Sequence, residues 1–345
     1  MRAADRREGD TGDTGDTGDT ESEGRRKNAA KRARKLAEKN QMPAVAPADV
    51  PKLQRVVDAE LVEPAPSGGI LEVFKQPFLL KLVVDRQLAA MYAGSLLGLL
   101  WSYIKPGMRF LVYYIVFGYI LHTHAGTPHF ALHLFTGLVF VHFFSESWQA
   151  STRSIWSNRT MVKKMRMPRE MFPLSAMVVA GYHTGPQILL LVVFCILSGW
   201  HLTVAAVLAG ILGAAILLAF CMALALFFSA FNVFYRDFQN IVATLMQFMH
   251  FLVPMMYSFP RVWTAQAAHP IAYQIYMANP VAEAVLLMQR FFWSPLMEKP
   301  GMLPAHSFPP DLWVRGLIML VISLGLLVWA QMYFARVQSR FAEVM

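Results

Sequence analysis

The hydrophobic pattern of residues 107–345 consists of long apolar runs separated by short polar segments. Two of the runs, residues 110–145 and 171–235, contain no Asp, Glu, Lys or Arg. A helix crosses the hydrocarbon core of a membrane with about 20 residues, so each of these runs is too long for a single crossing. Polar, turn-forming residues at 122–129 and 198–203 divide each run into two predicted helices.

Two further apolar runs, residues 238–260 and 316–335, are each long enough for a single crossing. The sequence therefore predicts an all-α membrane protein, with one transmembrane domain at 71–345 that contains six transmembrane helices. The predicted helices lie at about 107–122, 130–150, 172–197, 203–231, 239–258 and 315–335.

A helix with one apolar side is predicted before the first span, over residues 76–104. Its apolar residues recur at helical spacing: Leu80, Val84, Leu88, Met91 and Tyr92. Lys81 and Asp85 fall on the other side of the same helix. Because such a helix lies flat in the membrane interface, the pattern predicts an N-terminal amphipathic interface helix. Pro106 is predicted to mark the break before the first span.

Residues 261–311, between the fifth and sixth spans, are apolar in part but contain Pro270 and Pro280. Helical pieces in such a segment dip into the membrane or lie on it, and they are predicted on the outer side. Residues 1–70 differ from the rest, with 13 basic and 13 acidic residues and several prolines. They bury too little apolar surface to offset the entropy of ordering, so a disordered cytoplasmic tail is predicted.

The composition agrees with a membrane protein. Of the 345 residues, 56% are hydrophobic and only 15% are charged, which excludes a soluble globular enzyme. The net charge is +9, and the basic residues that produce it lie between the apolar runs. They therefore indicate membrane topology rather than a nucleic-acid-binding face. The turns at 122–129 and 198–203 contain no Lys or Arg, whereas 151–170 contains six. This bias predicts a multi-pass plasma (inner) membrane protein with both termini in the cytoplasm.

Motifs for catalysis are missing from the sequence. There is no phosphate-binding loop of the G-x-x-x-x-G-K-[ST] type, and the two cysteines predict neither a disulfide nor a metal site. The spans contain few ionisable residues besides His142, His183 and His250, and this argues against ion-driven transport. An integral-membrane glycosyl- or acyltransferase stays open as an alternative, for which the candidate acids are Glu146, Asp237 and Glu283.

Aromatic residues are the positive signal within the spans. Rings and phenol hydroxyls can contact sugars by stacking and by hydrogen bonds, although ordinary helix packing explains the same pattern. The candidates for a translocation path lie on the first and fifth spans: Phe110, Tyr113, Tyr114, Phe117, Phe248, Phe251 and Tyr257.

Four motifs in order resemble one transporter family. Residues 158–173 read NRTMVKKMRMPREMFP, which is similar to the pattern N-x-x-L-V-K-K-x-x-F-P-R-E-x-x-P of type-2 ABC exporter permeases for lipid-linked polysaccharides. Residues 232–237, NVFYRD, resemble the family's N-V-x-x-R-D turn. Residues 92–101, YAGSLLGLLW, resemble its entry motif, and Asn279-Pro280 resembles an N-P before its outer helices. Gln87, Met91 and Lys105 depart from the family's usual residues.

The resemblance implies a permease that pairs with a second copy of itself and with two copies of a cognate ATPase. ATP would be hydrolysed by that partner, and this chain would bind no cofactor or metal. Two sets of residues would lie at the ATPase side. The coupling loop would contain Asn158, Lys163, Lys164, Arg166, Pro168, Arg169 and Glu170, and the cytoplasmic turn would contain Asn232, Arg236 and Asp237.

The resemblance also implies the cargo, a polyprenyl-phosphate-linked polysaccharide of the galactan, teichoic acid or O-antigen type. The interface helix would border a lateral gate open to membrane lipids, and residues 261–311 would form outer gate helices. Arg86, Lys105 and Arg109 are the candidate contacts for the lipid pyrophosphate. A type-2 ABC drug or lipid exporter of the same fold stays open as an alternative.

Overall fold

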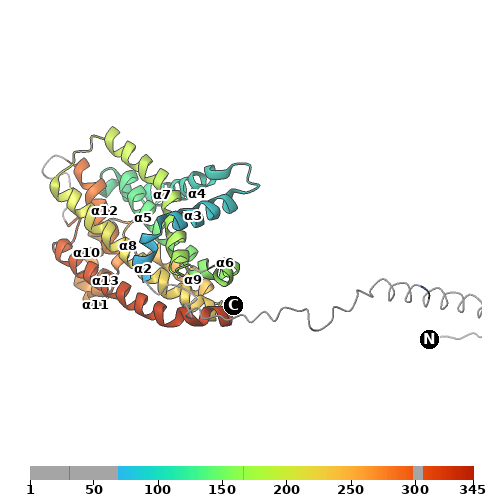
Figure 1. The fold of residues 1–345 in the computed structure, drawn as a ribbon. Helices are drawn as coiled ribbons and strands as arrows, with labels where there is room; N and C mark the ends of the chain where they lie inside the picture. The colour runs from blue at the N-terminus through green and yellow to red at the C-terminus, as the bar shows by residue number, and fades with distance from the viewer. Residues whose placement is uncertain (1–30, 32–68, 166, 298–305) are drawn as a thin grey trace, which may run out of the picture. The chain divides into compact units, whose positions relative to one another are not determined.

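The computed structural model describes Lys31 and residues 69–165, 167–297 and 306–345. The chain divides into two units, residues 1–62 and 63–345, and the fold below is that of the second. The predicted disordered tail, residues 1–70, lies outside the described residues except for Lys31, Gly69 and Ile70, and the last two begin the helix over Gly69–Lys75. Every regular element that the structure describes is a helix, which confirms the all-α class (Figure 1).

Four helices of the described part are long and apolar enough to cross a membrane. They correspond to the second, third, fourth and sixth predicted spans. They are α5 (Phe130–Ser157), α7 (Met171–Leu197), α8 (Val204–Phe234) and α13 (Leu312–Val337, continued by a 3₁₀ turn to Arg340).

The segments predicted as the first and fifth spans are built from shorter pieces. Helix α4 (Trp101–Tyr113) continues directly into a π-helix over Tyr114–Ile120. Helix α9 (Phe238–Met249) ends at Met249, and turns follow before Phe259. Pro106 lies inside α4 rather than at its start, so the predicted break at this proline is wrong.

The break falls earlier, after α3 (Pro77–Tyr92), which follows the short helix α2 (Gly69–Lys75). Gly94 and Gly98 have φ values of +72° and +45°. Only glycine adopts this left-handed region without strain, so these two residues permit the turn between α3 and α4. The predicted helix over 76–104 is therefore two helices, and α3 packs against α7 through a 2.9 Å hydrogen bond from Gln87 Nε2 to Ser175 Oγ.

The segment between α9 and α13 contains three α-helices among its described residues, α10 (Phe259–Ala268), α11 (Pro270–Met277) and α12 (Pro280–Phe292). The Asn279 side chain caps α12 by accepting a hydrogen bond from the Val281 amide at 3.0 Å. Helix α12 is mostly buried and packs against α8, α5 and α13 (Figure 1). It therefore belongs to the helical core instead of lying on its surface.

Small residues allow the core helices to approach closely. A Cβ atom added to Gly213 of α8 would lie 3.0 Å from the Ala284 carbonyl oxygen of α12. At Gly137 of α5, an added Cβ would meet Met255 Cβ and lie 3.0 Å from Met255 Cα, in the turns after α9. The second contact involves backbone, which cannot swing aside as a flexible side chain can.

We therefore expect Gly137→Ala to destabilise the protein by about 1–3 kcal/mol or more, the usual range for overpacking. In contrast, Gly181 of α7 has no atom within 4 Å of an added Cβ. Gly181→Ala is the matched control, since alanine is intrinsically better in a helix by about 1 kcal/mol. Thermal unfolding of the purified variants measures both effects, and equal unfolding temperatures would contradict the close contact at Gly137.

Candidate functional site

The predicted coupling loop is a short helix between two long ones. Helix α5 ends at Ser157, α6 spans Arg159–Lys164, and α7 begins at Met171. Asn158 is buried at the junction, where its Nδ2 donates to the Ser154 carbonyl at 2.8 Å. Its own carbonyl accepts from the Met161 and Val162 amides, so one residue ends α5 and starts α6.

Helix α6 has one buried and one exposed side. Val162 is buried in an apolar cluster with Ile155 and Phe172. Lys163 and Lys164 are exposed at the end of the helix. This short helix therefore presents two ammonium groups to its surroundings. Arg166, the third predicted basic residue, lies outside the described residues.

The rest of the predicted loop set is buried within the chain. Pro168, Arg169 and Glu170 are all buried, and Glu170 is 0% exposed. Gln331 Nε2 of α13 donates to Glu170 Oε1 at 3.1 Å. The Arg169 guanidinium lies 5.8 Å from the Phe341 ring centroid. Burial raises the pKa of Glu170 and lowers the pKa of Arg169. These residues attach the loop to the C-terminal helices.

The predicted cytoplasmic turn lies beside the coupling loop. Asn232 Oδ1 accepts a hydrogen bond from the Gln239 amide at 3.2 Å, which joins the end of α8 to the start of α9. The Arg236 guanidinium lies 4.0 Å from the centroid of the Trp156 ring. The Arg159 guanidinium lies 5.4 Å from the same ring. Trp156 thus links the loop and the turn, while Asp237 is exposed next to them.

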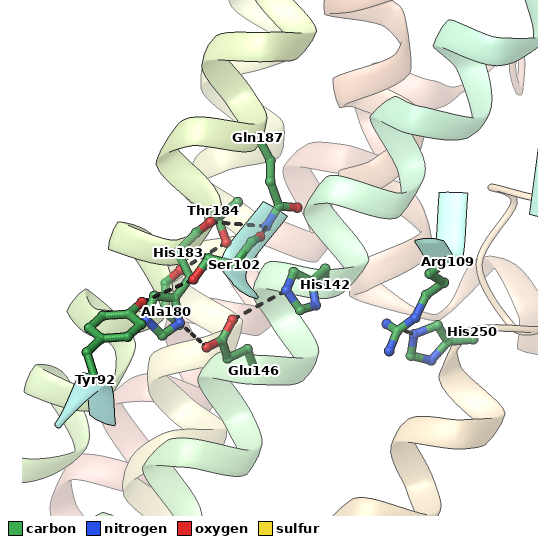
Figure 2. Close-up of polar contacts among 10 residues, drawn as sticks. All are labelled: Tyr92, Ser102, Arg109, His142, Glu146, Ala180, His183, Thr184, Gln187 and His250. Carbon is green, nitrogen blue, oxygen red and sulfur yellow. Dashed lines mark hydrogen bonds and ion pairs between the residues drawn. The ribbon is translucent and has the colours of Figure 1, made fainter. Parts of the chain in front are cut away.

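A carboxylate of α5 lies between two imidazoles, one from α5 and one from α7, as Figure 2 shows. His183 Nδ1 of α7 is hydrogen-bonded to Glu146 Oε1, and His142 Nε2 lies 3.5 Å from Glu146 Oε2. Nearby, the hydroxyls of Tyr92 and Ser102 are 3.1 Å apart. Gln187 Nε2 of α7 donates to the Ser102 carbonyl at 3.3 Å, so polar contacts join α3, α4, α5 and α7.

This cluster lines a cavity of about 470 Å³, which we call the Glu146 cavity. Its lining is Met91, Tyr92, Ser95, Gly98, Trp101, Ser102, Lys105, Pro106, His142, Glu146 and His183. A second cavity of about 410 Å³, the arginine cavity, shares Met91 and Glu146 with the first and adds Arg86 and Arg153. The two cavities are therefore neighbours with different charges.

The three cations predicted to meet a pyrophosphate are distributed over different places. Arg86 lines the arginine cavity, and Lys105 lines the Glu146 cavity. Arg109 is elsewhere, with its Nη1 3.4 Å from His250 Nε2 near the end of α9 (Figure 2). His250 Nδ1 lies 2.7 Å from the Met246 carbonyl, so Nδ1 is the donor and Nε2 accepts from Arg109.

The predicted path aromatics fall into two groups. Those of the first span are half-buried and contact one another, as in the stacked Phe110 and Tyr114 rings at 5.7 Å and the perpendicular Tyr113 and Phe117 rings at 6.1 Å. On and after α9, the rings of Phe248 and Phe251 are exposed. Tyr257 is instead tied to α11, with its hydroxyl 3.0 Å from the Tyr276 hydroxyl.

Comparison with known families matches residues 79–286 to the membrane-protein family described as ABC-2 type transporter. This segment covers more than half of the chain and includes the coupling loop and both cavities. The chain belongs to the ABC-2 type transporter family.

Among relatives of this ABC-2 chain are two proteins of Klebsiella pneumoniae named O-antigen export system permease protein RfbA. They are 26% and 24% identical over 267 and 275 residues, which cover 77% of this chain and 95% of each relative. A Myxococcus xanthus protein of the same name is 30% identical over 192 residues, which cover 54% of this chain and 71% of the relative. Within the ABC-2 domain, no group of three His, Cys, Asp or Glu residues in the described part is placed to hold a metal ion.

The sequence pattern missed how two parts of this ABC-2 domain come together. Trp156 was not predicted as a contact for Arg159 and Arg236, although an aromatic residue between basic segments is a recognisable signal. His142 and Glu146 are four residues apart, which places them on one side of α5. No local sequence pattern could predict that His183 of α7 joins them, because it is 37 residues away from Glu146 in the chain.

Proposed function

We propose that this chain is the permease subunit of an ABC exporter that moves a lipid-linked cell-envelope polysaccharide across the plasma membrane. The observation that carries this proposal is the similarity to the O-antigen export permeases over 95% of their length. The polymer is of the galactan, teichoic acid or O-antigen type. ATP is bound and hydrolysed by a separate subunit, in two copies, and two copies of the permease form the path.

Six spans and cytoplasmic termini are part of the proposal. The first span is α4 with its π-helix, the fifth is α9 with the following turns, and α10 to α12 form the outer gate. Four long apolar helices and the basic loop support it. Both native cysteines are buried, so a thiol reagent should react with an introduced cysteine and report on which side of the membrane that residue lies. An impermeant thiol reagent added outside should label Gly126→Cys and should not label Thr160→Cys. Labelling of Thr160→Cys would show that the orientation is the opposite of the proposed one.

In the proposed exporter, α6 docks on the ATPase, and Arg169 and Glu170 hold α6 in position from within. The exposed Lys163 and Lys164 support the first role, and the contacts to Gln331 and Phe341 support the second. The arginine cavity, with Arg86 and Arg153, is the proposed contact for the lipid phosphates.

The first-span rings are proposed to line the path. Tyr114→Ala is expected to lower export per folded complex severalfold, because the moving polymer loses a ring on which its sugars stack and a hydroxyl to which they hydrogen-bond. Tyr114 also stacks on Phe110, so the competing explanation is helix packing. Packing predicts less folded complex and full rescue by Tyr114→Leu. Export and complex yield measured for both variants decide between the two explanations, and full export in both would remove this residue from the path.

The function itself is tested by depletion. Cells depleted of the chain should accumulate a polyprenyl-linked glycan on the cytoplasmic face of the membrane, and its mass identifies the sugar and the lipid. Accumulation of a non-glycosylated lipid would favour the drug or lipid exporter of the same fold. The transferase alternative has less support, since Glu146 lines two cavities that neither Asp237 nor Glu283 lines.

A further inference from the structure

We propose that the Glu146 cavity is a sugar-binding subsite that holds one saccharide unit between the Trp101 ring and the Glu146 carboxylate. This inference rests on the proposed function and adds to it a recognition site for the glycan beside the phosphates. The volume of the Glu146 cavity, about 470 Å³, falls within the roughly 300–1,000 Å³ that is usual for small-molecule sites.

The carboxylate is held ready for hydroxyl groups. His183 is hydrogen-bonded to one Glu146 oxygen and His142 Nε2 lies 3.5 Å from the other, so the two rings restrict the orientation of the carboxylate. An ionised carboxylate has about four acceptor positions, which leaves one on each oxygen for a ligand. The Glu146 side chain is 25% exposed, and Glu146 lines the cavity. Two neighbouring sugar hydroxyls can therefore donate to it.

A second polar group lacks a partner at the same place. His183 is 5% exposed and lines the cavity, and its Nε2 atom has no hydrogen-bond partner among the described residues. Because Nδ1 faces Glu146, Nε2 of the neutral ring is an acceptor. A buried nitrogen without a partner costs free energy, and a hydroxyl-bearing ligand supplies the missing donor.

The apolar part of the cavity suits the C–H face of a sugar ring. Trp101 lines the cavity and is 43% exposed, and Lys105 Nζ lies 5.9 Å from the centroid of its ring. Tyr92 adds a second ring, with its hydroxyl held by Ser102. The cavity thus combines aromatic rings with hydroxyl groups and a carboxylate. This combination matches a saccharide, whose surface is apolar on its C–H faces and polar at its hydroxyls.

The charges separate this subsite from a phosphate site. Lys105 is the one Lys or Arg in the lining of the Glu146 cavity, so the Glu146 carboxylate balances its charge and leaves no excess positive charge there for an anion. The neighbouring arginine cavity has two guanidinium groups, Arg86 and Arg153. Since Glu146 and Met91 line both, a sugar and its attached phosphates fit side by side, the sugar in one cavity and the phosphates in the other.

Cysteine protection tests the subsite directly, in membranes that contain the permease with its ATPase. Ser95 is exposed and lines the Glu146 cavity, so Ser95→Cys reports its occupancy. Methyl glycosides of neutral hexoses and of N-acetylhexosamines should slow thiol labelling severalfold, and inorganic pyrophosphate should not. Ser198→Cys, exposed in the turn after α7, is the matched control and should be unaffected by either probe. Protection by pyrophosphate alone, or by neither probe, overturns the proposal.

Variants distinguish recognition from folding. In the Ser95→Cys background, Glu146→Gln keeps the size and one acceptor oxygen, and it should reduce glycoside protection. Trp101→Ala should remove the protection. Pyrophosphate should still protect Ser157→Cys in the arginine cavity of both variants, a result that general misfolding would not give. Undiminished glycoside protection in both variants overturns the role of these residues.

The subsite and the exporter proposal fail independently. If depletion causes a lipid-linked glycan to accumulate but no glycoside protects Ser95→Cys, the subsite is wrong and the exporter proposal stands. If glycosides protect but no glycan accumulates, the sugar site stands and the exporter proposal fails.

Discussion

Replacing Lys163 and Lys164 together with glutamate is expected to abolish ATP-driven export while the permease still folds. Both side chains are exposed at the end of α6, whereas the apolar anchor of that helix, Val162, is untouched. Reversing two charges at the proposed docking surface leaves like charges opposed, which costs several kcal/mol in binding. Co-purification of the ATPase and export per folded permease measure the effect.

The matched control for this charge reversal is Lys81→Glu, an exposed lysine of α3 outside the loop. It should leave the complex and export unchanged. Neutralisation of the pair, Lys163→Gln with Lys164→Gln, should give an intermediate loss, because it removes attraction without adding repulsion. An intact complex with normal export after the reversal would show that α6 does not couple the permease to its ATPase.

Glu170→Lys is expected to destabilise the protein by about 3–5 kcal/mol, the range for an uncompensated buried charge. The residue is fully buried, accepts from Gln331, and has Arg169 as its chain neighbour. A lysine there would place two cations together and lose the acceptor for Gln331. In the proposed exporter this attachment holds α6 in position, so export should fall together with the unfolding temperature. Asp85→Lys, an exposed acid of α3, is the control and should change neither quantity.

The pH dependence of Glu170 has a defined sign. Burial raises the pKa of Glu170 above its ordinary value of 4.5. A group with a raised folded-state pKa contributes stability below its unfolded pKa and loses it as the pH rises through the folded pKa. Glu170→Gln keeps the shape and cannot ionise, so it should become more stable relative to wild type over that interval. A constant difference in unfolding temperature across it would contradict the burial of an ionisable Glu170.

Local sequence patterns were sufficient for the long helices and for the family. Runs without charges predicted α5, α7, α8 and α13, because a segment that crosses a membrane must satisfy its backbone internally and expose apolar side chains. The same patterns did not predict where individual helices begin and end. Pro106 is inside α4, and α3 ends at Tyr92, since the turn depends on the backbone freedom of Gly94 and Gly98.

The sequence by itself also determined which residue types lie outside the bilayer, because charged side chains are costly within it wherever they occur in the chain. Only the tertiary structure decided their surroundings. Lys163 is exposed and Glu170 is buried, although both belong to one motif, because Gln331 comes to Glu170 from 161 residues away. His183 joins Glu146 across 37 residues in the same way. Periodicity reports which side of a helix is apolar, whereas the partner of each side chain depends on how the helices pack.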